Sequence, residues 1–362
     1  MTPEELQGFR SRIDAIDDKL ILLLAERAGL VQEVGRRKHL VGAPVFRPER
    51  EVDIIERMVA ANTGPLTAGS IARIWLEIIS GCRALEREMR VSYLGPAGTY
   101  SEQAVSVLFG HRVDLVPCAT LEEAMREAET GSVDCALLPV ENSTEGTVGR
   151  TLDILLATPL KISAEISLPI HHNLLSKDGE LTQIKQVVAH PQALAQCQHW
   201  LDQHLPGVLR LPVASNGHAA DMASKDSSIA AIAGQRAAEI YQLKAIEERI
   251  EDDPNNRTRF VAVGDFTPDR CGVDQTSLIL SVADKAGAVM SLIEPLARHG
   301  VSMKRFESRP SRQGSWKYYF YIDLVGHQHD SNLALALAEI KERATFFKML
   351  GSYPLFDRLT EK

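Results

Sequence analysis

The sequence lacks the signatures of several large protein classes. Its 5 cysteines among 362 residues form no Cys-x-x-Cys pair, which fits reduced thiols better than a metal site or a disulfide framework. No GxGxxG, P-loop or HExxH motif occurs, so the sequence implies no cofactor and no metal. The longest aliphatic run, residues 20–25, is far too short to cross a bilayer.

The charge of the chain argues against further kinds of partner and against a signal peptide. With a net charge of -8, the chain is a poor candidate for binding nucleic acid. Its first residues are acidic, whereas a signal peptide begins with basic residues. We therefore expect a cytoplasmic protein with neither nucleic acid nor a membrane as a partner. At roughly 100–200 residues per domain, the length predicts two or three domains.

Residues 1–90 predict an all-α domain. Apolar residues recur at intervals of three and four within residues 4–43, which contain no proline, so we expect one helix of about 35 residues. Further helices are expected near 48–62 and 68–88. A helix of about 52 Å cannot bury its apolar stripe on two shorter helices of its own chain. The alternatives are a coiled-coil dimerisation arm and an intertwined dimer with sites between chains.

The rest of the chain predicts two further domains. Short strands and helices alternate over residues 91–272, which is typical of an α/β fold and long enough for two lobes with a cleft between them. Residues 273–362 follow the order βαββαβ, the α+β ferredoxin-like motif. Its elements are expected at 276–283, 287–299, 301–308, 316–325, 331–343 and 346–350.

Three cations of the long helix could surround a small anion. Arg27 and Lys38 are 11 residues apart, so their positions differ by about 20° around the helix and about 16 Å along it. Arg10 lies about 25 Å from Arg27 and could join them only from an antiparallel partner chain. Taken alone, such residues are more often solvated surface charges.

Four stretches favour the anion site: RSRIDAID at 10–17, LLLAER at 22–27, EVGRRK at 33–38 and PERE at 48–51. Together they resemble the all-helical chorismate mutases, over residues 1–88. The resemblance implies a chorismate site in a homodimer or higher homo-oligomer, with Lys38 and Glu86 catalytic. The implied chorismate-binding residues are Arg10 of the partner chain with Arg27, Lys38, Arg47, Arg50, Glu51, Cys82 and Glu86.

The sequence departs from a common pattern of that family at three positions. Arg47 stands where an acidic residue is frequent, Cys82 where serine is usual, and Glu86 where glutamine often donates to the ether oxygen. A carboxylate donates only when protonated, which requires a raised pKa near apolar surface. We therefore expect mutase activity to fall with rising pH. The departures also leave open an inactive mutase.

Five blocks of residues 91–270 resemble prephenate dehydratase: GPAGTYSE at 95–102, LPVENSTEG at 138–146, HPQAL at 190–194, AAIAG at 230–234 and NNRTRF at 255–260. The resemblance implies two lobes like those of periplasmic binding proteins, with Thr258 as the catalytic hydroxyl. The implied prephenate-binding residues are Arg259, Phe260, Ser101, Asn142 and Ser143, and Glu141 is a weaker acid candidate. A structural ion pair is the alternative for Arg259 and a helix cap for Asn142 and Ser143.

Two short blocks, KAGAV at 285–289 and ESRP at 307–310, resemble the phenylalanine-binding ACT domain. The resemblance implies feedback inhibition by phenylalanine bound at an ACT–ACT interface. The implied binding residues are Gly287, Ala288, Val289, Glu307, Ser308, Arg309 and Pro310. Ala286 replaces the usual proline, and a purely structural dimerisation domain is the alternative.

The order of these resemblances is that of the bifunctional chorismate mutase–prephenate dehydratases. It implies an enzyme of phenylalanine biosynthesis that converts chorismate into prephenate and then into phenylpyruvate. A dehydratase with an inactive mutase domain and a non-catalytic amino-acid sensor remain as alternatives.

Overall fold

Three helices form the first part of the computed structural model, which describes residues 2–40, 44–311, 318–356 and 359. They are α1 (Pro3–Leu40), α2 (Pro48–Ala61) and α3 (Ala68–Ala84). Pro48 opens α2, and the Thr67 side chain caps α3 by accepting from the Ser70 amide. The expected last turn of the first helix, residues 41–43, lies outside the described residues.

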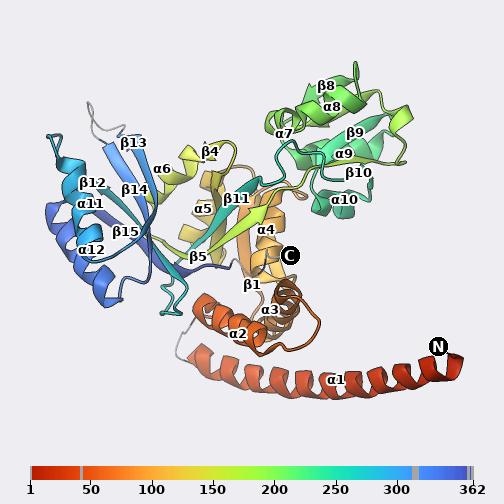
Figure 1. Cartoon of the computed structure of the whole chain (residues 1–362), viewed down its shortest axis with the longest axis horizontal. Coiled ribbons are helices and arrows are strands. Elements are labelled where there is room, and N and C mark those ends of the chain that lie inside the picture. The colour runs from red at the N-terminus through yellow and green to blue at the C-terminus, as the bar shows by residue number, and fades with distance from the viewer. Residues whose placement is uncertain (1, 41–43, 312–317, 357–358, 360–362) are drawn as a thin grey trace.

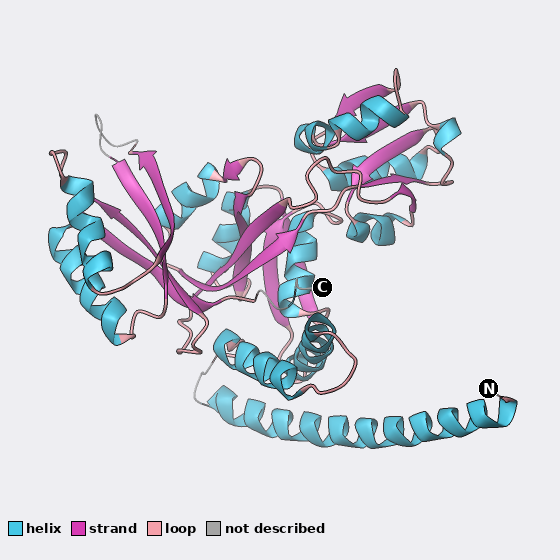
Figure 2. Cartoon of the chain, in the orientation of Figure 1, coloured by secondary structure: helices cyan, strands magenta, loops and turns pink. Residues whose placement is uncertain are grey.

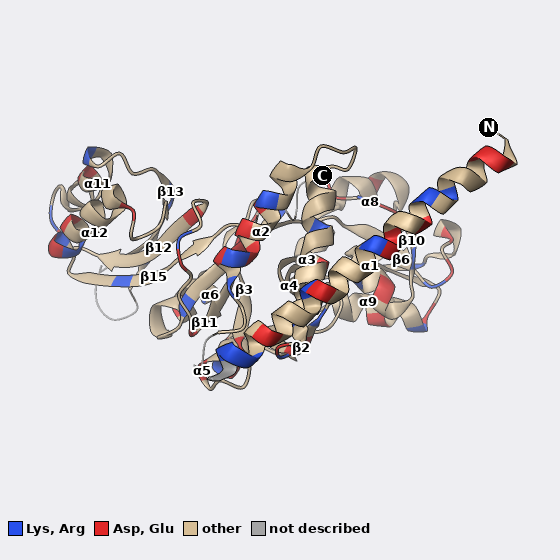
Figure 3. Cartoon of the chain, turned by 90° about the horizontal axis from the view of Figure 1, so that it is seen from below, with Lys and Arg blue, Asp and Glu red and all other residues tan. Residues whose placement is uncertain are grey.

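The long helix α1 extends beyond the rest of the chain (Figure 1). Its cationic and acidic residues are interspersed along its length (Figure 3). Its apolar residues are exposed, with 37–63% of their surface open at Leu6, Phe9, Ile13, Ile16, Leu20, Leu23, Leu30 and Val34. By contrast, α2 and α3 share a core with the first strand and helix of the next unit. A single chain therefore buries α2 and α3 and leaves the stripe of α1 uncovered.

The next unit has two lobes. The sheet of the first lobe runs β2-β1-β3-β11-β5, with β4 beside β3. Its strands are β1 (Met89–Leu94), β2 (Val113–Cys118), β3 (Cys135–Asn142), β4 (Gly146–Thr147), β5 (Lys161–Pro169) and β11 (Arg257–Gly264). Its helices are α4 (Tyr100–Phe109), α5 (Leu121–Glu129) and α6 (Gly149–Ala157). Because β11 returns from the second lobe between β3 and β5, two chain crossings join the lobes.

The second lobe has the sheet order β10-β6-β9-β7-β8. Its strands are β6 (Asn173–Ser176), β7 (Gln186–Ala189), β8 (Leu209–Pro212), β9 (Ile229–Ala233) and β10 (Lys244–Glu247). Its helices are α7 (Pro191–Gln196), α8 (Gln198–His204), α9 (Asn216–Lys225) and α10 (Gln235–Tyr241), with a 3₁₀ turn at Leu181–Gln183. The ribbons of Figure 2 show this lobe set apart from the first.

The C-terminal unit has the expected βαββαβ order and the sheet β13-β14-β12-β15. Its elements are β12 (Asp274–Ser281), α11 (Ala288–Arg298), β13 (Met303–Pro310), β14 (Tyr318–Val325), α12 (Ser331–Arg343) and β15 (Phe346–Pro354). One sheet face packs on α11 and α12, and the other joins the core of the first lobe. At Gly351, with φ +153°, a Cβ would overlap the Ile162 carbonyl oxygen, so glycine permits this close approach of β15 to β5.

The predicted fold class is confirmed in all three units, and the differences are local. In the second lobe, the residues 191–204 form two helices, because the backbone turns at Cys197 between α7 and α8. The strand expected at 301–308 spans 303–310, and the first two residues of the strand expected at 316–325 lie outside the described residues.

Candidate active sites

The first candidate site lies where the C-terminal end of α1 crosses the end of α3. Lys38 Nζ lies 3.3 Å from Glu86 Oε2, and both side chains are mostly buried. Gly35 makes this crossing possible, because a Cβ there would lie 2.6 Å from Glu86 Cγ. The structure thus brings together the two residues predicted to be catalytic in the helical unit.

Glu51 turns into the protein and pairs with a cation that sequence reasoning missed. Arg83 Nη1 donates to Glu51 Oε1 at 2.5 Å, and both side chains are buried. Burial raises the pKa of Glu51, and the charges of Arg83 and, more weakly, Lys38 oppose that shift. Cys82, also buried, precedes Arg83 on α3. The charge of Lys38 therefore acts on the pKa of Glu51, although the ion-pair partner of Glu51 is Arg83.

The other two predicted residues of α2 are held elsewhere. Arg47 contacts Glu49, and its Nη2 donates to Asp269 Oδ2 at 2.8 Å, in the segment that leads to the C-terminal unit. Arg50 pairs with Asp53 at 2.8 Å on an exposed face. In a single chain neither arginine joins Lys38 and Glu86.

The remaining two cations belong to α1. Arg27 is half-buried, and its Nη1 atom is buried without a hydrogen-bond partner in the described structure. Arg10 is exposed, 17 residues earlier on the same helix. Arg27 and Lys38 lie in the same angular sector as the uncovered apolar stripe. Arg27 and Lys38 therefore lie on the face of α1 that carries the stripe.

A cavity of about 730 Å³ separates this site from the first lobe. Gly35, Lys38 and Glu86 line one side of it. The opposite side comes from the two-lobed unit, with Asp134 and Phe266 among its residues. Phe46 is wedged into the same region, with its ring 5.5 Å from that of Phe266 and 4.9 Å from that of Phe109. The two-lobed unit therefore forms part of the surroundings of Lys38 and Glu86.

The second candidate site is built around Thr258, at the start of β11. Asn142, at the end of β3, stands directly opposite Thr258 and donates from Nδ2 to its Oγ1 at 2.8 Å. The Asn142 Oδ1 accepts from the amides of Thr144 and Glu145 at 3.0 and 3.1 Å, which fixes the orientation of the amide group. Ser143 accepts from the Arg257 amide at 2.9 Å. The structure thus brings Thr258, Asn142 and Ser143 together.

Polar groups that sequence reasoning missed extend this site into the second lobe. Asn142 Nδ2 also lies 2.9 Å from Asn256 Oδ1, and Asn256 Nδ2 donates to Gln196 Oε1 at 3.2 Å. His172 Nε2 lies 2.8 Å from the same Gln196 oxygen, and its Nδ1 lies 2.8 Å from the Tyr100 hydroxyl. Burial lowers the pKa of His172, which favours the neutral ring. The motif blocks contain Tyr100 and Asn256, but nothing in the sequence links them.

The cleft between the lobes contains a cavity of about 700 Å³. Ser101 and Tyr100 line it from the first lobe, and His190 and Asn216 line it from the second. The Tyr100 hydroxyl also reaches His172, so one side chain connects the cavity with the network around Thr258. The prediction of a cleft with Ser101 at its edge fits this geometry.

The other residues expected to bind the substrate face away from the cleft. Arg259 is bound by three carboxylates, at 2.7 Å from Glu141 and 2.8 Å from both Glu165 and Asp323. Phe260 is 2% exposed and belongs to the core of the first lobe. For Arg259 the structure therefore shows the structural ion pair that the sequence left as an alternative, and Phe260 is a packing residue.

The third candidate site lies at one end of the C-terminal sheet. Gly287, with φ +80°, precedes α11, while Glu307–Pro310 form the end of β13. Ser308 and Leu280 both pair with Phe320 of the strand between them, so β12 and β13 reach the same level there. The two blocks predicted to bind phenylalanine therefore share one end of the sheet. Arg309 turns to the first lobe, 3.6 Å from Asp153.

Three family models match successive parts of the chain: chorismate mutase type II over residues 9–87, prephenate dehydratase over 91–267 and the ACT domain over 276–342. A bifunctional chorismate mutase/prephenate dehydratase of Neisseria gonorrhoeae is 47% identical over 354 residues, 97% of each chain. The chain belongs to the bifunctional chorismate mutase/prephenate dehydratase family.

Two solved structures resemble the part of the chain that follows the helical unit. Prephenate dehydratase from Arthrobacter aurescens in complex with L-Phe is 35% identical, with a TM-score of 0.68, over 74% of this chain and 90% of that one. GqqA, described as a novel type of quorum-quenching acylase, is 27% identical with the same TM-score, over 74% and 98%. A shared fold alone therefore does not determine the chemistry, which depends on the residues of the site. Among the described residues, no helix is long and apolar enough to span a membrane.

Proposed function

We propose that this family member catalyses two consecutive reactions, the rearrangement of chorismate to prephenate and the conversion of prephenate to phenylpyruvate. The observation that carries the second activity is the Asn142–Thr258 pair at the junction of the two lobes. The Lys38–Glu86 site supports the first. We infer three domains, residues 1–90, 91–272 and 273–362, acting in the cytoplasm as a homodimer or higher oligomer.

In the dehydratase reaction, prephenate loses its ring hydroxyl and its ring carboxylate, the latter as CO₂, and the departing hydroxide needs a hydrogen-bond or proton donor. The Thr258 oxygen already accepts from Asn142, so its own proton is free to point to another acceptor. The Asn142 amide is itself held by two backbone donors, which keeps Thr258 oriented before substrate binds. Formation of the aromatic ring drives the step, and no nucleophile is needed.

In the mutase reaction, the substrate is a dianion that rearranges within itself. Cations accelerate such a step by holding the reactive conformer and by stabilising charge that develops on the ether oxygen. Arg27 and Lys38 lie in line with the uncovered stripe of α1. A second copy that covers this stripe antiparallel to the first would bring its Arg10 to the site. The free Nη1 of Arg27 supports a site that is completed by this anion and by the partner chain.

Phenylalanine is the proposed inhibitor of the dehydratase. The ACT match and the shared position of Gly287 and the Glu307–Pro310 block support a binding site at the end of the C-terminal sheet. The related dehydratase solved with L-Phe supports the same ligand. The sheet packs directly on the first lobe, so a ligand bound there can act on the dehydratase.

One assay tests these proposals. Purified protein is given chorismate and, separately, prephenate, and phenylpyruvate is followed with and without phenylalanine. Product from both substrates, reduced by phenylalanine, is the expected result. Product from prephenate alone would show an inactive mutase, which the placement of Arg47 and Arg50 makes a specific alternative. Product from neither substrate would contradict the enzyme assignment and favour a ligand sensor.

A further inference from the structure

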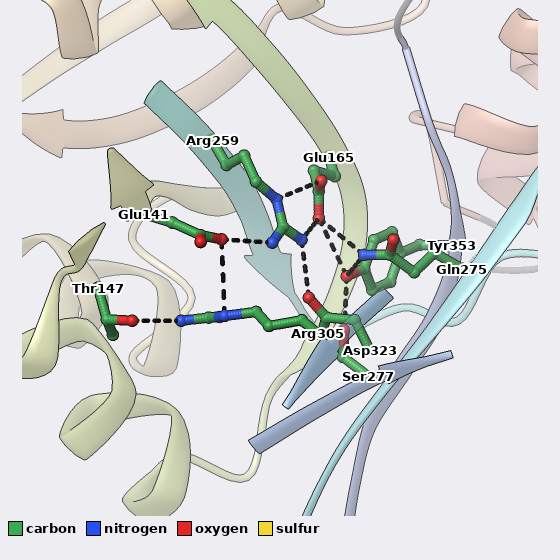
Figure 4. A network of polar contacts seen from close by, with 9 residues as sticks. All are labelled: Glu141, Thr147, Glu165, Arg259, Gln275, Ser277, Arg305, Asp323 and Tyr353. Atoms are coloured by element: carbon green, nitrogen blue, oxygen red, sulfur yellow. Dashed lines mark hydrogen bonds and ion pairs between the residues drawn. The ribbon is translucent and has the colours of Figure 1, made fainter. Parts of the chain in front are cut away.

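Arg259 joins the dehydratase lobe to the C-terminal sheet. Its guanidinium lies among three carboxylates, two from the first lobe, Glu141 and Glu165, and one from β14, Asp323 (Figure 4). The Nε and Nη2 atoms each donate to Glu165 at 2.8 Å, Nη1 donates to Glu141, and Nη2 also donates to Asp323. Such a set leaves the side chain one orientation, directed away from the cleft.

All four strands of the C-terminal sheet supply groups to this cluster. Ser277 donates to Asp323 at 2.6 Å and lies 2.6 Å from the Tyr353 hydroxyl, which reaches Glu165 at 3.2 Å. Arg305 of β13 lies 3.5 Å from Glu141 and donates to Thr147 at 2.9 Å. The cluster therefore responds to the position of the whole sheet and not to one strand alone.

On the dehydratase side, the cluster is one residue from the catalytic pair. Arg259 follows Thr258 on β11, and Glu141 precedes Asn142 on β3. The two pairs are neighbours along β3 and β11, with Thr258 opposite Asn142 and Arg259 opposite Glu141. Successive side chains of a strand point to opposite faces of the sheet. The Thr258–Asn142 pair therefore faces the site, and the Arg259–Glu141 pair faces the cluster. The register between β11 and β3 shifts directly after this pair, because Phe260 stands opposite Pro139 and Val140 of β3 is the extra residue of a β-bulge.

We propose that Arg259 is a positioning residue for Thr258 and Asn142, and that Asp323 is the group through which the C-terminal domain controls their geometry. This proposal rests on the proposed function. It identifies the contact between Asp323 and Arg259 as the route by which the C-terminal domain regulates the dehydratase. A shift of the C-terminal sheet would separate Asp323 from Arg259. The guanidinium would then pair with Glu141 and Glu165 alone. The neighbouring residues Thr258 and Asn142 would move with it, and the hydrogen bond between them would change.

The burial of Glu165 and Asp323 makes the contact of Asp323 with Arg259 sensitive to a shift. Separating a buried carboxylate from its cation leaves an uncompensated charge, which is costly. The strand β13 gives the ligand a mechanical connection, because it carries the predicted phenylalanine-binding block Glu307–Pro310. Two of its arginines, Arg305 and the Arg309 of that block, lie against carboxylates of the first lobe. A ligand that displaces β13 would pull on both contacts.

The test uses Asp323→Asn in the full chain, a substitution that keeps the shape of the side chain and removes its charge. We expect the dehydratase kcat to fall about 3- to 30-fold with KM unchanged, which is the range for residues that couple two sites. Phenylalanine should still bind, by calorimetry, but should inhibit the variant much less than the wild type. Asp323→Glu should restore part of the inhibition.

The matched control is Glu339→Gln, which removes ion pairs with Arg298 and His299 on the helical face of the same domain. It should keep wild-type rates and inhibition. If Asp323→Asn fails to fold, Ser277→Ala removes the donor to Asp323, together with the contact to the Tyr353 hydroxyl, and should weaken inhibition in the same direction. Full inhibition of folded Asp323→Asn or of Ser277→Ala, or loss of phenylalanine binding in either, would overturn the proposal. A wild-type protein without dehydratase activity would instead refute the proposed function on which it rests.

Discussion

The helical unit and the two-lobed unit build their sites in opposite ways. At Thr258, the hydroxyl accepts from Asn142, and the Asn142 amide is itself fixed by two backbone donors of the same chain. In the helical unit, by contrast, Arg27 has a buried nitrogen without a partner among the described residues, and the apolar stripe of α1 is exposed. The proposed dehydratase site therefore draws its described contacts from one chain, whereas we expect the proposed mutase site to need a second copy.

The largest expected effect comes from breaking the site that is complete in one chain. Replacing Thr258 with Ala removes the donor to the departing hydroxide and should lower the dehydratase kcat about 10²- to 10⁴-fold. The mutase rate, measured as loss of chorismate, should stay at the wild-type level because the two sites lie in different units. Thr258→Ser keeps a hydroxyl and serves as the control. Equal losses in Thr258→Ser and Thr258→Ala would contradict the role of the hydroxyl.

An intermediate effect is expected at the crossing of α1 and α3. An alanine at Gly35 would push Glu86 away from Lys38, so Gly35→Ala should reduce mutase kcat/KM about 10-fold or more. Gly29 of the same helix has no atom within 4 Å of a Cβ and lies on the side opposite the apolar stripe, so Gly29→Ala is the matched control. If both variants kept wild-type mutase rates, the crossing would not form part of the site.

The predicted protonation of Glu86 can be tested in the same assay. Donation to the ether oxygen requires a protonated carboxyl, so mutase activity should fall with rising pH if Glu86 is the donor. Glu86→Gln, which donates at every pH, should flatten that profile. A wild-type profile that is already flat across the neutral range would argue against this role.

The smallest expected effect is a pH dependence of the stability of the folded protein, which arises from His172 in the network around Thr258. Burial lowers the pKa of His172 in the folded state, so the unfolded chain binds the proton more readily. Stability should therefore be fully present above the ordinary histidine pKa and should decrease as pH falls through it. The midpoint of thermal unfolding, measured from pH 8 to about pH 5, should fall less steeply in His172→Gln. An identical slope in the variant would assign the effect to other groups.

The sequence was sufficient to predict the order of the units and to single out Thr258, Asn142 and Ser143. Periodicity predicts α1, and these three residues meet because one motif block ends β3 while the other begins β11, which pairs antiparallel with β3. What it missed depends on long-range pairing. Asp323 lies 64 residues from Arg259, and no local pattern predicts that the guanidinium next to Thr258 pairs with a carboxylate of the C-terminal unit.

The helical unit shows the complementary limit. Glu51 has the position expected of a substrate contact, but Arg83 offers it a buried charge partner within the chain. Arg47 similarly pairs with Asp269, which lies in the segment that leads to the C-terminal unit. Residue spacing predicts which face of a helix carries a cation. It does not predict the ion-pair partner of that cation, which depends on which other part of the chain packs against that face.

The most direct test of a mutase site shared between chains is complementation between two inactive variants. Arg10→Ala and Lys38→Ala should each lose mutase activity in homodimers, because every site lacks one cation. Co-expressed chains should recover about one quarter of the wild-type rate, since half of randomly paired dimers hold one intact site. Thr258→Ala and Asn142→Ala chains, co-expressed in the same way, should recover no dehydratase activity. Mutase activity no higher than the average of the two variants would contradict the shared site.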